Sequence, residues 1–516
     1  MQTAFISCLT LLGLTILLGG CALPSLESRE SSFALPVSAA ENTRLGKAVA
    51  SRLDEQVENS GIHLLDNPHE AFAARMLLAS TADRTLDLQY YIWHGDVSGT
   101  LLLNALHQAA MRGVRVRLLL DDNGTAGLDR ELAALATHPN IQIRLFNPFT
   151  LRKAKWLGYI THFGRANRRM HNKSFTADNR ATIIGGRNVG DDYFGATSGV
   201  LKQDLDLLAI GPIVQKVSDD FDRYWSSQSA YPVEQIVAAV DSEQATDIIG
   251  SGQKFNNDGR GGSYLDAVRN TSFVSELLSG KLPFEWAATK MVSDDPAKGL
   301  GKADKDGLLI HRLTPIIGRP QDSLVLVSPY FVPTLAGVEF FADIANQGVT
   351  VNILTNAMEA TDVLPVHAGY AKHRKALLKA GVKLYELRRT STDPKPHKSA
   401  AGPFGSSSSS LHAKTFAVDG QRIFVGSFNF DPRSMHLNTE LGFVVESPVL
   451  ARAIADEFSN KAALTAYEVK LDAHGKLYWL EQRGASSIRH DTEPGATIGK
   501  RIALRILSVL PIDWLL

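Results

Sequence analysis

The chain has 516 residues, which allows about three domains. Apolar side chains make up 44% and charged side chains 21% of it, so a fibrous, collagen-like or wholly disordered chain is excluded. Lys and Arg (54) balance Asp and Glu (54), and a chain of zero net charge is not a general nucleic-acid-coating protein. Both cysteines lie within the first 21 residues, which excludes a disulfide framework or a thiolate metal site in the rest of the chain.

The N-terminus has the pattern of a bacterial lipoprotein signal. Residues 9–18 form an apolar run that is too short to span a bilayer but suits the hydrophobic region of a signal peptide. The run leads into LGGC at 18–21, which resembles a lipobox, so we expect Cys21 to be lipidated and to become the mature N-terminus. The absence of Lys and Arg before this point weakens the export signal, and an uncleaved anchor or a buried helix is the alternative. We therefore predict a signal peptide at 1–20 and a tether at 21–60.

After the tether, the chain repeats itself. Residues 86–120 and 324–354 each contain a β-like run ending in aromatic side chains, a segment of helical periodicity, and a second run rich in β-branched residues. A further helix–strand step follows at 128–146 and 371–387. Such alternation predicts an α/β fold in which mixed, mostly parallel sheets are covered by helices.

One motif occurs once in each repeat and is the strongest signal in the chain. It has the form His-x-Lys-x4-Asp-x6-Gly-[Gly/Ser]-x-Asn. Its two copies contain His171, Lys173, Asp178, Gly186 and Asn188, and His412, Lys414, Asp419, Ser427 and Asn429. The histidines are 241 positions apart, close to the offset of 235 between the repeats, so two coincidental surface strands are a poor explanation.

The spacing predicts where these side chains point. Residues i and i+2 of a strand face the same side, so the His and Lys of each copy lie together. The Asp begins a tight turn, and the small residue after the returning strand lets the backbone approach a ligand, with the Asn amide at the same edge. If the repeats pack about a pseudo-twofold axis, one phosphate-binding site receives two His, two Lys and two Asn.

Two imidazoles suit a two-step displacement at phosphorus. One neutral His attacks and forms a covalent phosphohistidine, while the other donates a proton to the leaving oxygen and then activates the acceptor. The Lys and Asn side chains balance the charge of the phosphate oxygens. The sequence offers no Cys ligand set and no acidic His cluster, so we expect neither a metal nor a cofactor, although two His alone could also be zinc ligands.

Each of these histidines needs a partner on its other ring nitrogen. Aligning DLDLLAIGP at 204–212 with ELGFVVESP at 440–448 superposes Asp204 on Glu440. We predict that these two carboxylates orient the histidines, with Asp206 as the competitor in the first repeat. Strand capping and surface ion pairs are the alternative roles for them.

Two basic stretches lead into the motifs. Residues 151–173 contain seven Lys or Arg and no acidic residue, and residues 371–398 contain nine Lys or Arg against two acidic residues. A neutral protein can therefore focus positive potential at this site, which favours an anionic ligand. For 371–398, a solvated basic helix face is the plainer explanation.

The duplicated motif resembles that of the phospholipase D superfamily, and finer features resemble the bacterial cardiolipin synthases, closest to their C-type subgroup. These features are DLDLLAIGP at 204–212, LVLVSPYFVP at 324–333 and YAKHRKALLKAGVKLYE at 370–386, and the resemblance covers roughly residues 60 to 516. It implies two pseudo-symmetric lobes, a metal-independent phosphohistidine mechanism, phosphatidylglycerol as acceptor and, as in the C-type, phosphatidylethanolamine as donor. By similarity alone, His171 is the nucleophile and His412 the acid and base.

We accordingly expect an N-terminal lobe at 61–250, a linker or lid at 251–315, a C-terminal lobe at 316–470 and a C-terminal segment at 471–516. The apolar end of this segment, 501–516, suits either a bilayer interface or a final helix packed on the core. Together with the lipid anchor, these features predict a protein of the bacterial cell envelope with a periplasmic body.

The expected function is phosphatidyl transfer to phosphatidylglycerol, which makes cardiolipin, with membrane phospholipids and no nucleic acid as partners. The alternatives are a phospholipase D hydrolase that uses water, a nuclease of the same superfamily, and a lipid-binding lipoprotein without activity. Transfer requires a dry channel above the histidines. Five aromatic side chains at the strand ends could line that channel or belong to the core: Tyr90, Tyr91, Trp93, Tyr330 and Phe331.

Overall fold

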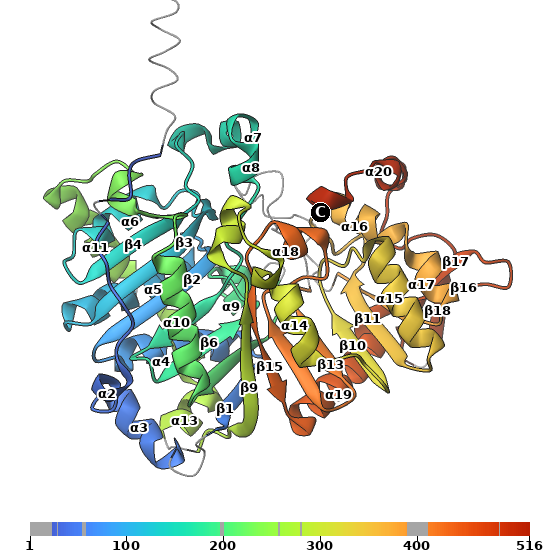
Figure 1. Cartoon of the computed structure of the whole chain (residues 1–516), viewed down its shortest axis with the longest axis horizontal. Helices are drawn as coiled ribbons and strands as arrows, with labels where there is room; N and C mark the ends of the chain where they lie inside the picture. The colour runs from blue at the N-terminus through green and yellow to red at the C-terminus, as the bar shows by residue number, and fades with distance from the viewer. Residues whose placement is uncertain are drawn as a thin grey trace, which may run out of the picture.

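The computed structural model describes residues 23–27, 29–53, 58–196, 201–255, 259–278, 281–389, 411–484 and 486–516. The predicted signal peptide and Cys21 lie outside these residues. Figure 1 shows two lobes side by side, each a sheet with helices packed on it. The predicted fold class, mixed α/β sheets covered by helices in two similar lobes, is confirmed. None of the helices in the described ranges is long and apolar enough to cross a bilayer.

The N-terminal lobe is built on a mixed sheet with the strand order β8-β4-β3-β2-β5-β6-β7-β1. Its strands are β1 (Ser60–Leu65), β2 (Thr85–Ile92), β3 (Arg115–Gly124), β4 (Ile141–Phe146), β5 (Ser174–Ala177), β6 (Ala181–Gly185), β7 (Asp206–Ile210) and β8 (Ala230–Pro232). The central strand β2 is buried along its whole length, because helices cover it on one face and the rest of the lobe on the other.

The sheet of the C-terminal lobe has the order β15-β14-β13-β10-β11-β12-β16-β17-β18. Its strands are β10 (Ser323–Val327), β11 (Thr350–Asn356), β12 (Lys383–Leu387), β13 (Thr415–Val418), β14 (Arg422–Gly426), β15 (Leu441–Glu446), β16 (Ala466–Leu471), β17 (Leu477–Arg483) and β18 (Ser486–His490). Seven neighbouring strands, β8 to β7 in one lobe and β16 to β15 in the other, have the same order, as the sequence repeat predicts.

The sheets are mixed, but they are not mostly parallel as predicted. Among the strands that the structure describes, parallel pairing is confined to β2–β3–β4 and β10–β11–β12, and these are the strands joined by the helical crossovers. The strands of the motif, β5–β6 and β13–β14, form tight antiparallel hairpins, and the strands beside them also pair antiparallel. The prediction extended the crossover geometry to strands that a short turn connects instead.

The helices start from local signals in the sequence. Asn67, Asp96 and Ser447 cap α4, α5 and α19, and each accepts a hydrogen bond from the first turn of its helix. The α-helices are α2 (Val37–Ala40), α3 (Arg44–Leu53), α4 (Pro68–Thr81), α5 (Val97–Met111), α6 (Asp129–Ala136), α7 (Gly158–Thr161), α8 (Phe163–Ala166), α9 (Asp191–Phe194), α10 (Ile213–Trp225), α11 (Ser242–Phe255), α12 (Gly259–Arg269), α13 (Ser272–Leu278), α14 (Leu309–Ile317), α15 (Thr334–Asn346), α16 (Leu364–Ala371), α17 (Arg374–Lys379), α18 (Pro432–His436), α19 (Pro448–Thr465) and α20 (Ile498–Val509). The 3-10 helices are η1 (Arg152–Leu157), η2 (Val233–Gln235), η3 (Pro296–Leu300), η4 (Lys305–Gly307) and η5 (Asp513–Leu515).

We predicted a linker or lid at 251–315, but this segment is also part of the sheets. It contributes β9 (Glu285–Ser293), which pairs antiparallel with β1 of one lobe and with β15 of the other. β9 therefore joins the two sheets along the middle of the molecule (Figure 1). The sequence on both sides of β9 is rich in Gly and Asp, which is typical of loops, and the strand was therefore not predicted.

The predicted tether is also part of the folded N-terminal lobe. The guanidinium group of Arg29 donates a hydrogen bond to the carbonyl oxygen of Ser227 at 2.5 Å, and Arg117 donates to the carbonyl oxygen of Ser32 at 2.8 Å. Leu35 and Val49 are 8% exposed, so they are buried against the lobe. Residues 29–53 therefore pack on the surface of the lobe, and the prediction of a tether over 21–60 is wrong for this part of it.

A shared apolar core holds the lobes together. Ile184 and Leu207 of the N-terminal lobe belong to the same buried cluster as Val425 and Phe443 of the C-terminal lobe. β6 contacts both β14 and β15 across this interface. The returning strands of the two motifs, β6 and β14, are thus packed against each other, which brings the two copies of the motif to one place.

Candidate active site

The Asp of each motif anchors the hairpin rather than the reacting groups. Asp178 and Asp419 have φ angles of +50° and +54°, as a tight turn at these positions requires. The Asp178 carboxylate accepts hydrogen bonds from the backbone N–H groups of residues 83–85 at 2.8 to 2.9 Å. The Asp419 carboxylate does the same with residues 321–323 at 2.8 to 3.2 Å. The sequence predicted the turn but not this pinning of the strands β2 and β10.

Two short bridges between the lobes position the histidines. Met170 pairs with Thr439, and Leu411 pairs with Gln203, each as an isolated parallel bridge. The backbone N–H of His171 donates to the carbonyl oxygen of Thr439 at 2.9 Å, and that of His412 donates to the carbonyl oxygen of Gln203 at 2.8 Å. Each histidine is therefore held beside the residue that follows its bridge partner in the opposite lobe.

Those following residues are the two predicted carboxylates. Glu440 lies 2.8 Å from Nδ1 of His171, and Asp204 lies 2.5 Å from Nδ1 of His412. Both pairs cross the interface between the lobes. Because Nδ1–H donates to the carboxylate, the neutral ring presents an unprotonated Nε2. Asp206, the competitor, instead binds Arg75 at 2.8 Å and lies 3.5 Å from Arg187.

The lysines of the motif complete a buried cluster. Lys173 and Lys414 are each 1% exposed, and each ammonium group donates to the carbonyl oxygen of the histidine of its own motif. Lys414 Nζ also lies 3.2 Å from Nδ1 of His412. The ammonium group of each lobe acts electrostatically on the histidine of the other lobe, so the four side chains form one site.

Burial sets the charge state of this cluster. It lowers the pKa of His171 and of His412 well below the ordinary value, and the ammonium groups lower both further. It also lowers the pKa of Lys173 well below its usual range and that of Lys414 to about 8. It raises the pKa of Glu440 to about 7. A bound phosphate would balance the lysine charges, so the site is built to gain stability from an anion.

The residues that follow the returning strands contact the carboxylates, and direct phosphate binding by Ser427 and Gly186 stays a prediction. The Ser427 hydroxyl donates to Glu440 Oε2, and the Ser427 carbonyl oxygen lies 3.1 Å from Nδ1 of His171. The Gly186 N–H donates to a backbone carbonyl at 3.2 Å, and a Cβ at Gly186 would lie 2.1 Å from Oδ1 of Asp204. Glycine is needed here because the Asp204 carboxylate occupies the space of a side chain.

The two motif asparagines differ from each other. The Asn188 amide nitrogen donates to the Tyr193 hydroxyl at 2.8 Å, and its oxygen accepts from the backbone N–H of Ile92 at 3.2 Å. One amide hydrogen of Asn188 therefore forms a hydrogen bond within the protein, and the second could be donated to a ligand. The Asn429 side-chain oxygen is buried, and no described residue forms a hydrogen bond with it. An amide oxygen accepts and does not donate, so a contact of Asn429 with phosphate oxygens would use the amide nitrogen and stays a prediction.

The aromatic side chains divide between the site and the core. The Tyr91 ring packs edge-on against His171 with its centroid at 5.0 Å. Tyr90, Trp93 and Phe331 are at most 1% exposed and belong to the cores of the lobes. Tyr330 is half-buried, and its hydroxyl donates to Asp362 at 2.9 Å. Of the five aromatic residues predicted at the mouth, Tyr91 thus contacts a histidine of the motif, and Tyr90, Trp93 and Phe331 belong to the core.

Sequence reasoning missed several residues that support the site. The Tyr193 ring packs edge-on against His412 at 5.2 Å, and Lys202 donates to the Tyr193 hydroxyl at 2.9 Å. On the other side, Ser434 donates to Glu440 at 2.8 Å, and the N–H of Glu440 donates to Asp294 at 2.8 Å. These residues carry no motif, and only the packing of the lobes brings them to the histidines. The described part of the chain contains no cluster of three or more side chains suited to hold a metal ion.

Comparisons with known proteins fit this geometry. Residues 76–225 and 313–462 match the family "Cardiolipin synthase, PLD-like domain", and each stretch contains one copy of the motif. The chain is 48% identical to cardiolipin synthase C of Escherichia coli (strain K12), over 92% of this chain and 100% of that protein. It is 24% identical to cardiolipin synthase of Staphylococcus aureus (strain Mu50), over 77% of this chain and 66% of that protein.

A solved structure extends the comparison to the fold. The crystal structure of phosphatidylserine synthase from Haemophilus influenzae matches 82% of this chain and 92% of its own chain, with a TM-score of 0.53 and 14% identity. That likeness shows a shared fold. The two matched stretches and the 48% identical relative show the family: the chain belongs to the PLD-like cardiolipin synthase family.

Proposed function

We propose that the chain is a phosphatidyltransferase that makes cardiolipin by transferring a phosphatidyl group to phosphatidylglycerol through a covalent phosphohistidine. The observation that carries this proposal is the pair of buried histidine–carboxylate hydrogen bonds, one from each lobe, in a single site. The family and the 48% identity to cardiolipin synthase C support the substrate class. The donor is proposed to be phosphatidylethanolamine, on the resemblance to the C-type subgroup.

The first step forms the covalent intermediate. Nε2 of His171 attacks the donor phosphorus, and the bond from phosphorus to the headgroup alcohol breaks as His412 donates a proton to the leaving oxygen. His412 must be protonated for this step. The negative charge of the bound phosphodiester favours the protonated form, because it balances the lysine charges that lower the pKa of His412. Glu440 keeps the His171 ring oriented through Nδ1.

The second step releases the product. His412, now neutral, removes the proton from a glycerol hydroxyl of phosphatidylglycerol, and the hydroxyl oxygen attacks phosphorus. The phosphorus–nitrogen bond to His171 breaks, and both histidines return to their starting states. Lys173, Lys414 and Asn429 stabilise the charge on the phosphate oxygens in both steps. The pseudo-twofold arrangement makes exchange of the two histidine roles chemically equivalent, and similarity alone favours His171 as the nucleophile.

Exclusion of water supports transfer over hydrolysis. His412 is 1% exposed and His171 is 6% exposed, so a phosphohistidine here would be shielded from bulk solvent.

The products of the reaction distinguish transfer from hydrolysis. The protein is incubated with phosphatidylglycerol and acyl-labelled phosphatidylethanolamine, and lipids are followed by mass spectrometry. Labelled cardiolipin and free ethanolamine are expected, whereas phosphatidic acid as the sole product would show a hydrolase.

We also propose that Cys21 carries a lipid anchor and that the body faces the periplasm. The support is the sequence at 18–21 together with the membrane phospholipids that the proposed reaction uses. Growth with labelled palmitate followed by immunoprecipitation should give a labelled protein, and Cys21→Ser should remove the label. Label that persists in Cys21→Ser would contradict the lipobox assignment.

A further inference from the structure

Exposed apolar side chains are concentrated in two short surface segments. Of the eighteen large apolar residues that are exposed in the described part of the chain, ten lie within residues 151–163 or 498–514. We call residues 151–166 the N-lobe tip and residues 498–516 the C-lobe tip. Scattered single apolar residues are normal on a protein surface, but two such groups mark a surface that contacts something apolar.

The N-lobe tip consists of η1, α7 and α8. Trp156 is 60% exposed and Ile160 is 70% exposed, and Leu151 and Phe163 are exposed beside them. η1 and α7 contain no buried residue. Helices this short, with their apolar side chains in water, gain little from the core of the lobe. The apolar side chains of the N-lobe tip are therefore available to an external apolar phase.

The C-lobe tip consists of α20 and η5, and α20 has apolar side chains on two sides: one packs on the lobe and the other is exposed. Leu504 is buried against α16, which attaches α20 to the lobe. On the other face, Ile498, Ile502 and Val509 are 76%, 55% and 79% exposed, at spacings that align them along the helix. Trp514 of η5, which follows α20, is 59% exposed. Packing on the core explains the first face and leaves the second unexplained.

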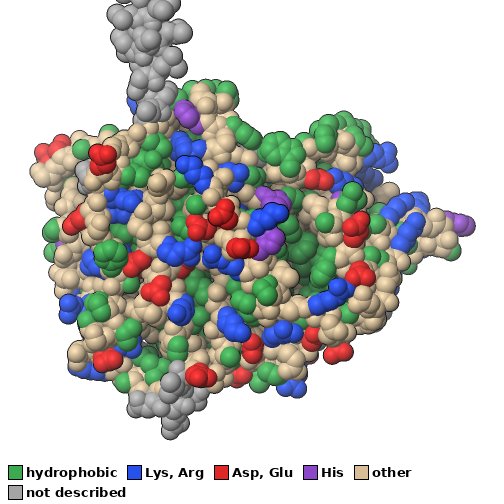
Figure 2. Space-filling view, in the orientation of Figure 1, with side chains coloured by type: hydrophobic (Ala, Val, Ile, Leu, Met, Phe, Trp, Pro, Cys, Tyr) green, Lys and Arg blue, Asp and Glu red, His purple; other side chains and the backbone are tan. Residues whose placement is uncertain are grey.

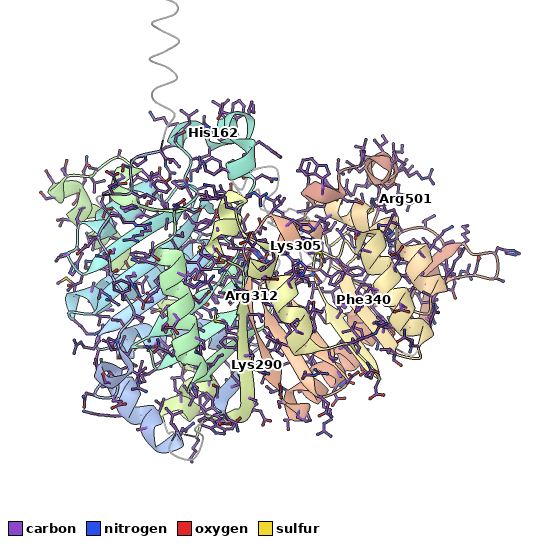
Figure 3. The ribbon with its side chains drawn as sticks, in the orientation of Figure 1. His162, Lys290, Lys305, Arg312, Phe340 and Arg501 are labelled. Atoms are coloured by element: carbon purple, nitrogen blue, oxygen red, sulfur yellow. The ribbon has the colours of Figure 1, made fainter. Side chains whose placement is uncertain are left out.

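The two tips lie on the same edge of the molecule. Figure 1 shows α7, α8 and α20 along one edge, and Figure 2 shows apolar side chains gathered there over both lobes. Figure 3 labels His162 in the N-lobe tip and Arg501 in the C-lobe tip on this edge. Arg433 connects the tips: it donates to the carbonyl oxygen of Asn167, next to α8, at 2.7 Å, and its backbone N–H donates to the carbonyl oxygen of Leu516 at 2.6 Å.

The edge that carries the tips is close to the histidines. The Tyr159 hydroxyl of α7 donates to Asn123 at 3.0 Å, and Asn123 donates to the Tyr91 hydroxyl at 3.4 Å. Tyr91 in turn packs against His171. Arg433 follows Asn429 of the motif by four residues and acts electrostatically on His171. An apolar phase in contact with both tips would therefore adjoin the proposed site.

Cationic side chains flank both tips. A cavity of about 420 Å³ beside the N-lobe tip is lined by Arg130, Arg152, Lys153 and Lys155. Arg152 pairs with Asp122 and Asp129 and Lys155 pairs with Asp122, so two positive charges of the lining remain in excess. On the C-lobe tip, Lys500 and Arg505 are exposed. A second copy of this chain docked on the same surface would bring these cations together. An anionic bilayer surface complements them while its acyl region accepts the apolar side chains.

We propose that the N-lobe tip and the C-lobe tip insert together into the surface of a bilayer that contains anionic phospholipids, and so hold the mouth of the site against its lipid substrates. The inference rests in part on the proposed function, because it names the surface through which that site meets lipids. Trp156 and Trp514 lie at the level of the headgroups, where indole rings are favoured. The bilayer contact is thus made by the folded body and is separate from any anchor at the N-terminus.

The tryptophans provide a direct test. All six tryptophans lie in the described part of the chain, and Trp156 and Trp514 are the exposed ones. The full chain with His171→Ala, which cannot turn over lipid by the proposed route, is reconstituted in vesicles of phosphatidylethanolamine and phosphatidylglycerol with bromine on the upper acyl carbons. Bromine quenches only indoles that contact the lipid. Trp156→Phe and Trp514→Phe should each remove part of the quenching, and the double variant should remove most of it.

Matched variants test the role of the apolar stripe. Ile502→Glu should lower the quenching of Trp514, whereas Val449→Glu, at an exposed position on α19 at the opposite edge in Figure 1, should leave it unchanged. Replacing phosphatidylglycerol by phosphatidylcholine, or raising the salt, should also lower the quenching. Melting temperatures verify that each variant is folded.

Two results would overturn the proposal. One is quenching that persists in the double tryptophan variant, and the other is a dimer in detergent-free sedimentation that buries both tryptophans without lipid. Because the measurement uses His171→Ala, a failure of the transferase proposal would leave its outcome unaffected.

Discussion

Asp204 of the N-terminal lobe accepts a hydrogen bond from Nδ1 of His412 of the C-terminal lobe at 2.5 Å, and Glu440 and His171 form the reciprocal pair at 2.8 Å. Each histidine thus takes its orientation and tautomer from a carboxylate of the opposite lobe. The interface between the lobes is therefore part of the proposed catalytic site. Neither repeat alone would contain a correctly oriented histidine.

Removal of the Asp204 charge should lower the rate without changing substrate binding much. In Asp204→Asn, the amide can donate to the ring and so favours the wrong tautomer, and we expect kcat to fall about 10–100-fold with KM nearly unchanged. Asp204→Glu should restore part of the loss. Glu446→Gln, at the exposed end of β15, is the matched control and should have wild-type kinetics. Wild-type kcat in Asp204→Asn would contradict the positioning role.

The pH dependence of kcat/KM should report Lys414. Burial lowers the pKa of Lys414 to about 8, so its ammonium form, which is proposed to balance the substrate phosphate, is present below that pH and lost above it. We expect kcat/KM of the wild type to decline as the pH rises through about 8. In Lys414→Arg the cation persists, so the decline should move to higher pH even though the plateau is lower. An identical decline in both proteins would assign it to another group.

The sequence predicted both carboxylates but not how they pair. The alignment of Asp204 with Glu440 used the repeat, which relates equivalent positions and says nothing of contacts between the repeats. The bridges Met170–Thr439 and Leu411–Gln203 arise only when the lobes dock, and they exchange the partners. The same limit applies to Ser427 and Gly186. Their small size predicts close approach of the backbone to a ligand, which stays a prediction, but it gives no sign of the carboxylates beside them. In the structure, the Asp204 carboxylate occupies the space in which a Cβ of Gly186 would lie.

A side chain at Gly186 should therefore act through Asp204. The added Cβ of Gly186→Ala would lie 2.1 Å from Oδ1 of Asp204, so the carboxylate must move away from His412. We expect a fall in kcat of about 10–100-fold, similar to that of Asp204→Asn, and little further loss when the two changes are combined. Ser427→Ala, which creates no clash, should lose less. Fully additive losses in the double variant would show that Gly186 acts elsewhere.

The motif Asp residues should affect stability rather than chemistry. Burial would raise the pKa of Asp419, but the hydrogen bonds from residues 321–323 outweigh it and lower the pKa. The stabilisation is therefore complete above the ordinary carboxyl pKa and is lost as the pH falls through the lowered value. Asp419→Ala should cost about 1–3 kcal/mol at neutral pH. The difference in melting temperature from the wild type should shrink below about pH 4.

Asp456→Ala, at an exposed position on α19, serves as the control for this measurement and should melt like the wild type at every pH. A wild-type melting temperature for Asp419→Ala at neutral pH would contradict the anchoring role of Asp419.

The fold was predictable where local pattern determines it. The crossover strands β2–β3 and β10–β11 and the hairpins of the motif follow from periodicity and turn residues. β9 was not predictable, because its pairing partners are far away in the sequence. β1 lies more than 220 residues before β9, and β15 lies more than 140 residues after it. Tyr193 and Ser434 were missed for a similar reason: each reaches the site from a short helix that carries no periodic signal.

The most direct test of the account is detection of the covalent intermediate. His412→Ala lacks the acid of the first step and the base of the second, so a donor with a p-nitrophenyl leaving group, which needs no acid, should release one equivalent of p-nitrophenol and leave a phosphatidyl adduct. Mass spectrometry of a digest is predicted to locate that adduct on His171, and His171→Ala should give neither burst nor adduct. Near wild-type turnover in either variant, or a burst without an adduct on either histidine, would contradict the two-histidine mechanism.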